Sequence, residues 1–255
     1  MLYRIILILL TFILFTQNAI ALPLENRIQQ YPQWNNKPPA KIAKGDLYYP
    51  NWMAGTWEVE SILKEQIAPL APEVITPGFN DNQQYIEQPI TFLVRFETKD
   101  FETKKRVFFP KLNHNKQNFV VSDREFNGTN IAAAYLGTNN VLKVKIAPEN
   151  PNQQLTLLKG DRQLISTVIK RATETPTPNC FITTEVTKQL FESPARFYLN
   201  EVETTSNYQL IAPGNIQAQQ FTAIYLSPQD PDYFKAINHP VAIYRYQLNF
   251  KKEGN

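Results

Sequence analysis

Cysteine and histidine are almost missing from this sequence. It contains one cysteine, Cys180, and two histidines, His114 and His239. A single thiol cannot form an intramolecular disulfide, and these side chains are too few for the common cysteine and histidine metal sites. Cys180 precedes a strand-like segment, a setting typical of a small buried side chain. We therefore predict that the chain holds no metal and depends on its apolar core for stability.

Glycine is scarce as well, with 8 residues, and the sequence motifs of several enzyme classes are missing. No glycine-rich loop could cradle a phosphate group, and no Gly-x-Ser-x-Gly elbow could present a nucleophilic serine. These absences exclude the common nucleotide-binding and serine hydrolase types, and we predict no cofactor.

Three acidic pairs are the remaining candidates for chemistry. A spacing of two residues puts both carboxylates on one face of a strand, where they could exchange protons or bind a hard cation. The pairs are Asp123 with Glu125, Glu201 with Glu203, and Asp230 with Asp232. An exposed polar strand produces the same spacing, so we assign no catalytic residue. The sequence favours a non-enzymatic role and leaves an enzyme as an alternative.

Charge of one sign does not accumulate anywhere in the chain. The formal net charge is +3, and Lys104-Lys105-Arg106 is the one tight basic cluster. A cluster of three at the end of a hairpin is ordinary solvated surface, and a nucleic-acid site requires a broader basic stripe. We therefore expect neither a nucleic acid nor an anionic membrane surface as partner.

No apolar run reaches the roughly 20 residues that a membrane-spanning helix needs. The run over residues 5–15 follows Arg4 and precedes Ala19-Ile20-Ala21, which is the pattern of a secretory signal peptide cleaved after Ala21. We predict a signal peptide over residues 1–21. The mature protein should then be soluble, exported and without a membrane span, and we expect a monomer.

Proline marks the segment that follows. Residues 22–45 are polar, carry no apolar period and include Pro38-Pro39, which enforces an extended backbone. We predict an N-terminal arm over residues 22–45 that contacts the remaining domain, residues 46–255, through Tyr31 and Trp34.

Segments with alternating apolar and polar residues fill the domain. In residues 88–97, for example, Ile90, Phe92, Val94 and Phe96 share one face. The predicted strands are 52–63, 88–97, 106–109, 118–122, 141–147, 154–159, 163–171, 181–191, 195–205, 208–211, 216–226 and 241–250. Short turns separate most of them, and closing such a meander into a barrel removes its exposed edges.

Helix is limited to two short segments in this interpretation. Residues 128–136, with a cap at Thr129 or Asn130, and residues 231–237 could each form one or two turns. We therefore predict an all-β fold, a single antiparallel β-barrel of about eight to ten strands with one or two short helices.

One connection is much longer than the others. Residues 64–88 contain four helix breakers and also the apolar residues Ile67, Leu70, Val74, Ile75 and Phe79. A long apolar loop of this kind usually folds over other parts of a protein as a lid. We expect it to cover an end of the barrel.

The residues Gly55-Thr56-Trp57, together with this loop, resemble the lipocalin and wider calycin superfamily. The resemblance implies that Gly55 allows close backbone approach, that Trp57 plugs the barrel floor and that Arg245, near the end of the chain, stacks on the indole. In residues 241–250 successive side chains point to opposite faces, so Arg245 and its neighbours Tyr244 and Tyr246 cannot all point into the barrel. If Tyr244 and Tyr246 line the interior, Arg245 points outward.

The segments DLYYPNWMAGTWEVES, residues 46–61, and APLAPEVITPGFN, residues 68–80, resemble a second family. Its members are exported proteins of unknown function from cyanobacteria and plastids. The resemblance implies a location in the periplasm or the thylakoid lumen, and it implies no activity.

Aromatic and apolar side chains are the strongest functional signal. The candidate ligand contacts are Ile75 and Phe79 in the long loop, and Phe92, Phe96, Tyr225 and Tyr244 on predicted strands. A barrel of this size either packs such side chains in its centre or leaves a ligand cavity between them. We predict non-enzymatic binding of a hydrophobic small molecule such as a pigment, quinone or lipid. The alternatives are a filled barrel that docks on a photosynthetic (thylakoid) membrane complex, and a calycin-type isomerase.

Overall fold

The computed structural model describes residues 23–101, 117–195 and 197–254. The predicted signal peptide, the predicted strand 106–109, the basic cluster Lys104-Lys105-Arg106 and His114 lie outside these ranges. Among the described helices, none is both long and apolar enough to cross a bilayer.

One antiparallel sheet of twelve strands dominates the described residues. Its strands are β1 (Lys41–Ile42), β2 (Tyr48–Tyr49), β3 (Gly55–Ile67), β4 (Pro89–Phe101), β5 (Gln117–Ser122), β6 (Val141–Ala147), β7 (Asn150–Leu158), β8 (Arg162–Thr177), β9 (Cys180–Glu192), β10 (Phe197–Ala212), β11 (Asn215–Leu226) and β12 (Ala242–Lys252). The helical elements are α2 (Pro23–Gln29), η1 (Asn51–Met53), η2 (Asn80–Tyr85), α3 (Arg124–Leu136), η3 (Thr138–Asn140) and η4 (Tyr233–Lys235).

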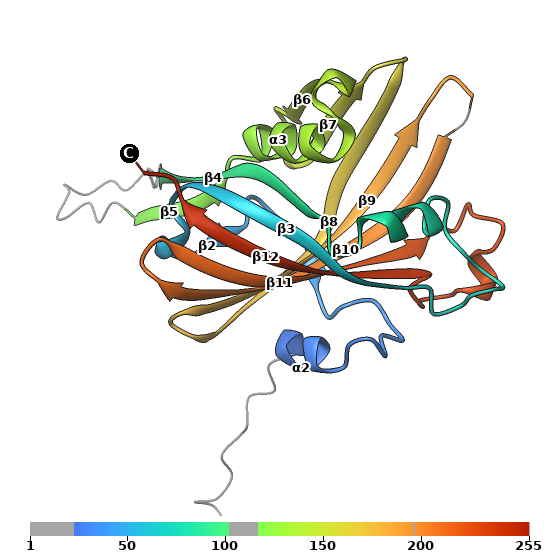
Figure 1. Ribbon diagram of the computed structural model, residues 1–255, viewed down its shortest axis with the longest axis horizontal. Helices are drawn as coiled ribbons and strands as arrows, with labels where there is room; N and C mark the ends of the chain where they lie inside the picture. The colour runs from blue at the N-terminus through green and yellow to red at the C-terminus, as the bar shows by residue number, and fades with distance from the viewer. Residues whose placement is uncertain (1–22, 102–116, 196, 255) are drawn as a thin grey trace, which may run out of the picture.

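The sheet curls into a half-barrel (Figure 1). Its hydrogen-bonded order is β2-β5-β4-β3-β12-β11-β10-β9-β8-β7-β6, and β1 pairs with β8 beside this path. The all-β, barrel-like prediction is therefore confirmed, but the expected closed barrel of about eight to ten strands is wrong in number and in closure. In the described residues the two ends of the order are β2 and β6. Helix α3 packs against β4 and against β6 and β7, so it spans the gap between the two sides of the curl.

Most predicted strands are present with shifted ends. Strand β6 has the predicted bounds, whereas β3 begins at Gly55 and continues to Ile67 because Asn51–Met53 forms a 3-10 turn before it. The predicted strands 195–205 and 208–211 are one strand, β10, because Ser206 and Asn207 stay paired with Gln220 and Gln219 of β11. Two polar residues in succession do not end a strand when they stay paired with the strands on both sides, here β9 and β11.

The helices differ more from expectation. Helix α3 begins at Arg124, earlier than Thr129 or Asn130, because the Asp123 side chain accepts a hydrogen bond from the Phe126 N–H at 3.0 Å and caps it. In residues 231–237 only the 3-10 turn η4 forms. Helix α2 lies in the arm, where we expected no helix.

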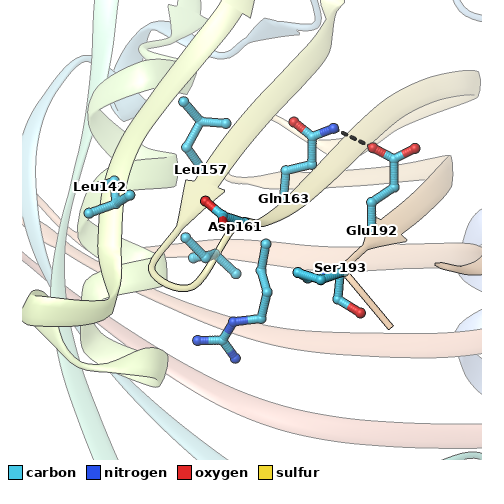
Figure 2. A pocket seen from close by; sticks show the side chains of 9 residues that line it. Leu142, Leu157, Asp161, Gln163, Glu192 and Ser193 are labelled. Atoms are coloured by element: carbon cyan, nitrogen blue, oxygen red, sulfur yellow. Dashed lines mark hydrogen bonds between the residues drawn. The ribbon is translucent and has the colours of Figure 1, made fainter. Parts of the chain in front are cut away.

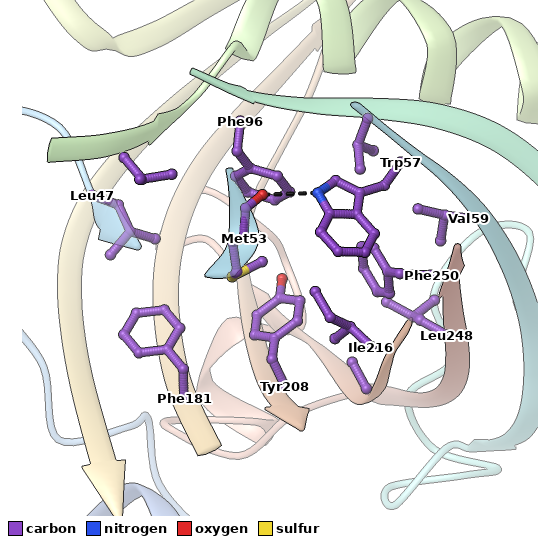
Figure 3. Packing of buried hydrophobic residues seen from close by; sticks show 13 residues of the cluster. Leu47, Met53, Trp57, Val59, Phe96, Phe181, Tyr208, Ile216, Leu248 and Phe250 are labelled. Carbon is purple, nitrogen blue, oxygen red and sulfur yellow. Dashed lines mark hydrogen bonds between the residues drawn. The ribbon is translucent and has the colours of Figure 1, made fainter. Parts of the chain in front are cut away.

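Trp57 lies at the centre of the main core, on the concave face of the sheet (Figure 3). Its side chain is 0% exposed, and its indole N–H donates to the Met53 carbonyl at 2.8 Å. The core also contains Leu47, Met53, Val59, Val94, Phe96, Val120, Phe181, Tyr208, Ile216, Ala218, Leu248 and Phe250. This end of the concave face is therefore filled by side chains.

Gly55 leaves room for the end of the Lys252 side chain and adopts a left-handed backbone conformation. Its φ of +119° is one that other residues rarely adopt, and a Cβ atom there would lie 2.8 Å from the Lys252 Cε. The Lys252 ammonium in turn lies 5.5 Å from the centre of a Trp57 ring.

Arg245 does not take the place that the lipocalin resemblance implied. It pairs with Glu65, whereas Trp57 pairs with Lys252 seven residues further along β12, roughly 23 Å away at about 3.3 Å per residue. Arg245 lies on the outer face, where its Nε is 3.2 Å from the Glu65 Oε2 and its guanidinium 5.9 Å from the Tyr31 ring. Strand alternation explains this, because Tyr244 and Tyr246 take the concave side.

We predict that Trp57→Ala lowers the free energy of unfolding by about 3–5 kcal/mol, because it opens a cavity in a packed core. Urea denaturation followed by circular dichroism measures this loss. The control Phe234→Ala removes a ring that is 82% exposed and should change stability by less than about 0.5 kcal/mol. An unchanged unfolding midpoint for Trp57→Ala would contradict the structural role of the indole.

Tyr208 makes the stability of this core depend on alkaline pH. Burial raises the pKa of its hydroxyl from 10.0 to about 12. Above about pH 10 the unfolded chain loses this proton while the folded chain keeps it, so stability should fall as pH rises from about 10 to about 12. Urea midpoints across this range check the prediction, and the fall should be shallower for Tyr208→Phe. Identical pH profiles for both proteins would refute it.

Candidate functional site

The N-terminal arm packs on the convex, outer face of the sheet. Trp34 is buried against Phe221, Ala223, Tyr225 and Ile243, and Tyr31 packs at the edge of this cluster. The Tyr31 ring centre lies 4.9 Å from that of Phe221. The predicted contact of Tyr31 and Trp34 with the domain is therefore confirmed.

A buried ion pair anchors this arm. Arg27 of α2 donates from Nε to the Glu203 Oε1 at 2.6 Å and from Nη2 to Oε2 at 2.5 Å. The Tyr225 hydroxyl donates to the same carboxylate at 2.8 Å, and Thr205 does so at 2.8 Å. Glu203 is 0% exposed, so all of its contacts come from the protein. Burial, followed by the charge of Glu203, raises the pKa of the Tyr225 hydroxyl.

The structure does not bring the six predicted ligand contacts to one site. Tyr225 lies under the arm on the outer face. Phe96 belongs to the main core and Phe92 packs against it. Phe79 and Tyr244 lie together elsewhere, with ring centres 5.9 Å apart, and Ile75 is 42% exposed. Alternation showed which residues share a face within one strand, but not which face of each strand is concave.

The long connection covers one end of the sheet. After β3 ends at Ile67, Val74 packs against Leu226 and Val241. Phe79 then packs against the cluster of Leu63 and Tyr244. The connection therefore folds over the end of β11 and the start of β12.

An ion network crosses the concave face below α3. Arg124 of α3 donates from Nη2 to the Glu185 Oε1 at 3.1 Å, and Arg171 of β8 donates from Nε to the same oxygen at 2.8 Å. Arg171 also donates to the Asn152 Oδ1 at 2.7 Å. Two guanidinium groups share one carboxylate, and the network ties α3 to β8 and β9. Sequence reasoning did not find it, because its members are separated by many residues.

The open end of the half-barrel contains two adjoining hollows, which we call the mouth pocket. One has a volume of about 350 Å³ and lies between the end of α3 and strands β7 to β9. Its lining residues are Leu136, Asn140, Leu158, Arg162, Leu164 and Phe191. The other, of about 570 Å³, shares Leu158 and Arg162 and adds Leu142, Leu157, Asp161, Gln163, Glu192, Ser193 and Pro194 (Figure 2).

The apolar wall and the Gln163–Glu192 pair of the mouth pocket lie on opposite faces of strands β8 and β9, and Arg162 lies on the face of the apolar wall. Leu164 and Phe191 are direct cross-strand partners on β8 and β9. The Arg162 Nε donates to the Lys159 carbonyl at 2.8 Å, which holds the guanidinium stem in place. Gln163 donates to Glu192 across the same strands (Figure 2). None of these residues was a sequence candidate. The Lys159-Gly160-Asp161 turn was the available signal, since it places the β7–β8 hairpin tip here.

At least one member of each acidic pair is held by a cationic side chain or by a helix N-terminus. Asp123 caps α3 and binds Arg95, with 2.5 Å between Oδ2 and Nη2. Glu201 binds Lys37 and Asp232 binds Lys235. Among the described residues, no group of three or more histidine, cysteine or acidic side chains could hold a metal ion.

We predict that Arg27→Ala lowers the free energy of unfolding by about 3–5 kcal/mol, because it leaves the Glu203 charge buried without a partner. Urea denaturation measures this, and limited proteolysis should show faster cleavage in the arm. Lys64→Ala breaks an ion pair with Glu87 at the surface and should cost less than about 1 kcal/mol. Equal effects of the two substitutions would show that Arg27 does not anchor the arm.

Comparisons with other proteins place this chain in a family. Neither a search of curated proteins nor a search of solved structures found a match. A family model described as "Domain of unknown function (DUF6816)" matches residues 41–254, a range that begins at β1 and includes every strand of the sheet. The chain therefore belongs to the DUF6816 family.

Proposed function

We propose that this protein binds a hydrophobic small molecule with a polar end, of the pigment, quinone or lipid class, in the mouth pocket. The observation that carries the proposal is the apolar hollow between α3 and strands β7 to β9. Ligand pockets typically measure about 300–1,000 Å³ and combine apolar walls with a few polar groups. Both parts of the mouth pocket fall within that range.

The lining suggests how the ligand is oriented. Leu136, Leu164 and Phe191 form an apolar wall, whereas Arg162 belongs to both hollows. An acyl chain or ring would lie against the apolar wall, and a carboxylate or carbonyl at its other end would accept hydrogen bonds from the guanidinium. In this proposal the half-barrel holds its ligand at one end, as a lipocalin does, and its other end is filled by the core around Trp57.

The proposed setting is the periplasm or thylakoid lumen, and the proposed role is carriage rather than catalysis. The export signal predicted over residues 1–21 supports the location. The Glu192 carboxylate in the pocket accepts a hydrogen bond from Gln163, so it has a structural partner already.

A docking role on a membrane complex is the second candidate. Large apolar side chains are exposed at the mouth pocket, namely Leu142 of its lining and Phe197, the cross-strand partner of the lining residue Glu192. Exposed apolar patches mark sites of protein association as well as ligand sites. In that case these exposed apolar side chains would contact the surface of another protein.

The test is binding of a fluorescent fatty acid, cis-parinaric acid, to the purified protein. Leu136→Asp should weaken binding at least about tenfold, because it places a charge in the apolar wall. Ile131→Asp is the matched control: it lies on the same helix, is 37% exposed where Leu136 is 48% exposed, and is not a lining residue. Arg162→Gln should weaken binding of the fatty acid more than binding of the matching fatty alcohol.

Two outcomes would count against the proposal. Equal losses for Leu136→Asp and Ile131→Asp would show that the pocket is not the site. Absence of binding to the unaltered protein, together with its recovery in a complex from membranes, would favour the docking role.

A further inference from the structure

The outer face of three neighbouring strands carries six carboxamide side chains in two regular rows. In the first row Asn207 pairs with Gln219, and Gln219 pairs with Gln247. In the second row Gln209 pairs with Gln217, and Gln217 pairs with Asn249. We call these six residues the amide lattice. Neighbouring strands lie about 4.8 Å apart and alternate residues about 6.7 Å apart, so the lattice presents a repeating pattern.

Most of the lattice is free to bind. The four glutamines are exposed, and none of their amides has a hydrogen-bond partner among the described residues. At the margins, Asn207 accepts from the Cys180 thiol and Asn249 donates to Glu60. Each glutamine therefore offers both a carbonyl acceptor and an NH₂ donor to an outside molecule.

The lattice borders a shallow, open hollow, which we call the groove. This hollow of about 490 Å³ lies over β10, β11 and β12, and five of the six amide residues line it. Arg245 also lines it and is paired with Glu65. The groove is thus lined by neutral groups and one compensated charge. It lies on the sheet face opposite to the concave core.

Several outward positions of other strands carry charged side chains. Lys143 and Lys145 occupy them on β6, Lys188 on β9 and Glu58 on β3. Charged side chains are the common choice for a solvated strand face. Six uncharged amides over three adjacent strands therefore call for a reason beyond solubility.

We propose that the amide lattice binds a linear, neutral oligosaccharide. A row of hydroxyl groups needs a donor and an acceptor at each step, and a carboxamide supplies both. The groove has no surplus charge to attract an ion, and an apolar ligand would bury amides without partners. A repeating ligand matches the repeating rows.

A peptide is a weaker fit to the same groove. Extended peptides usually add to a sheet through backbone hydrogen bonds at an edge strand. Strands β10, β11 and β12 lie inside the sheet and are paired on both sides, so their backbone groups are already used. Only side chains remain available here, so a peptide would lack the backbone hydrogen bonds that usually hold it to a sheet.

The test follows the side-chain NH₂ signals of ¹⁵N-labelled full-length protein by NMR. Cellohexaose, maltohexaose and chitohexaose are the probes, each titrated separately. At least one should produce saturable shifts in the NH₂ signals of Gln217, Gln219 and Gln247. Gln219→Ala should weaken that binding by about tenfold, whereas Gln30→Ala, which removes an exposed amide on the arm, should leave it unchanged.

Two results would overturn the proposal. One is the absence of lattice shifts with all three sugars at millimolar concentration. The other is a shift of the same signals with protein concentration alone, which would assign the lattice to contact between two copies of the chain. Binding of cis-parinaric acid should leave these signals unmoved, so the test is independent of the mouth pocket.

Discussion

The pairing of β3 with β12 is the contact on which the rest of the structure depends. It joins the beginning of the sheet to the end of the chain, with Trp57 opposite Lys252 and Glu65 opposite Arg245. Without it, the meander from β6 to β12 would be an open sheet with β12 exposed, and β3 to β5 would be a separate ribbon. Its register also decides which side chains of both strands enter the concave core.

The curvature of the sheet gives it a concave and a convex face, and the two faces have different roles. The concave face is filled around Trp57 at one end and hollow at the mouth pocket. The convex face is covered by the arm, where a buried ion pair joins Arg27 to Glu203, and carries the amide lattice beside it. The family match begins at Lys41, so α2 and Trp34 lie before it. The arm side of these contacts therefore lies before the matched range, whereas the partners Glu203 and Phe221 lie inside it.

Helix α3 takes the place that further strands would occupy in a closed barrel. It packs against β4 on one side and against β6 and β7 on the other. The contacts that hold it include the Asp123 cap, the ion pair of Arg124 with Glu185, a hydrogen bond of 3.0 Å between Ser61 and Tyr135, and the hydrogen bonds of Asn127 with Arg95 and Ser122. The last turn of the same helix supplies Leu136 to the mouth pocket, so the element that bridges the curl also shapes the candidate site.

The sequence by itself determined the all-β class and most strand positions. These depend on local alternation and on turn residues, which act over a few residues. The tertiary structure alone decided the half-barrel, the outward position of Arg245, the burial of Tyr225 under the arm and the mouth pocket. Alternation divides each strand into two faces but does not say which face becomes concave, because the register between distant strands sets that. The mouth pocket and the amide lattice are each formed by residues of several strands, which come together only in the folded chain.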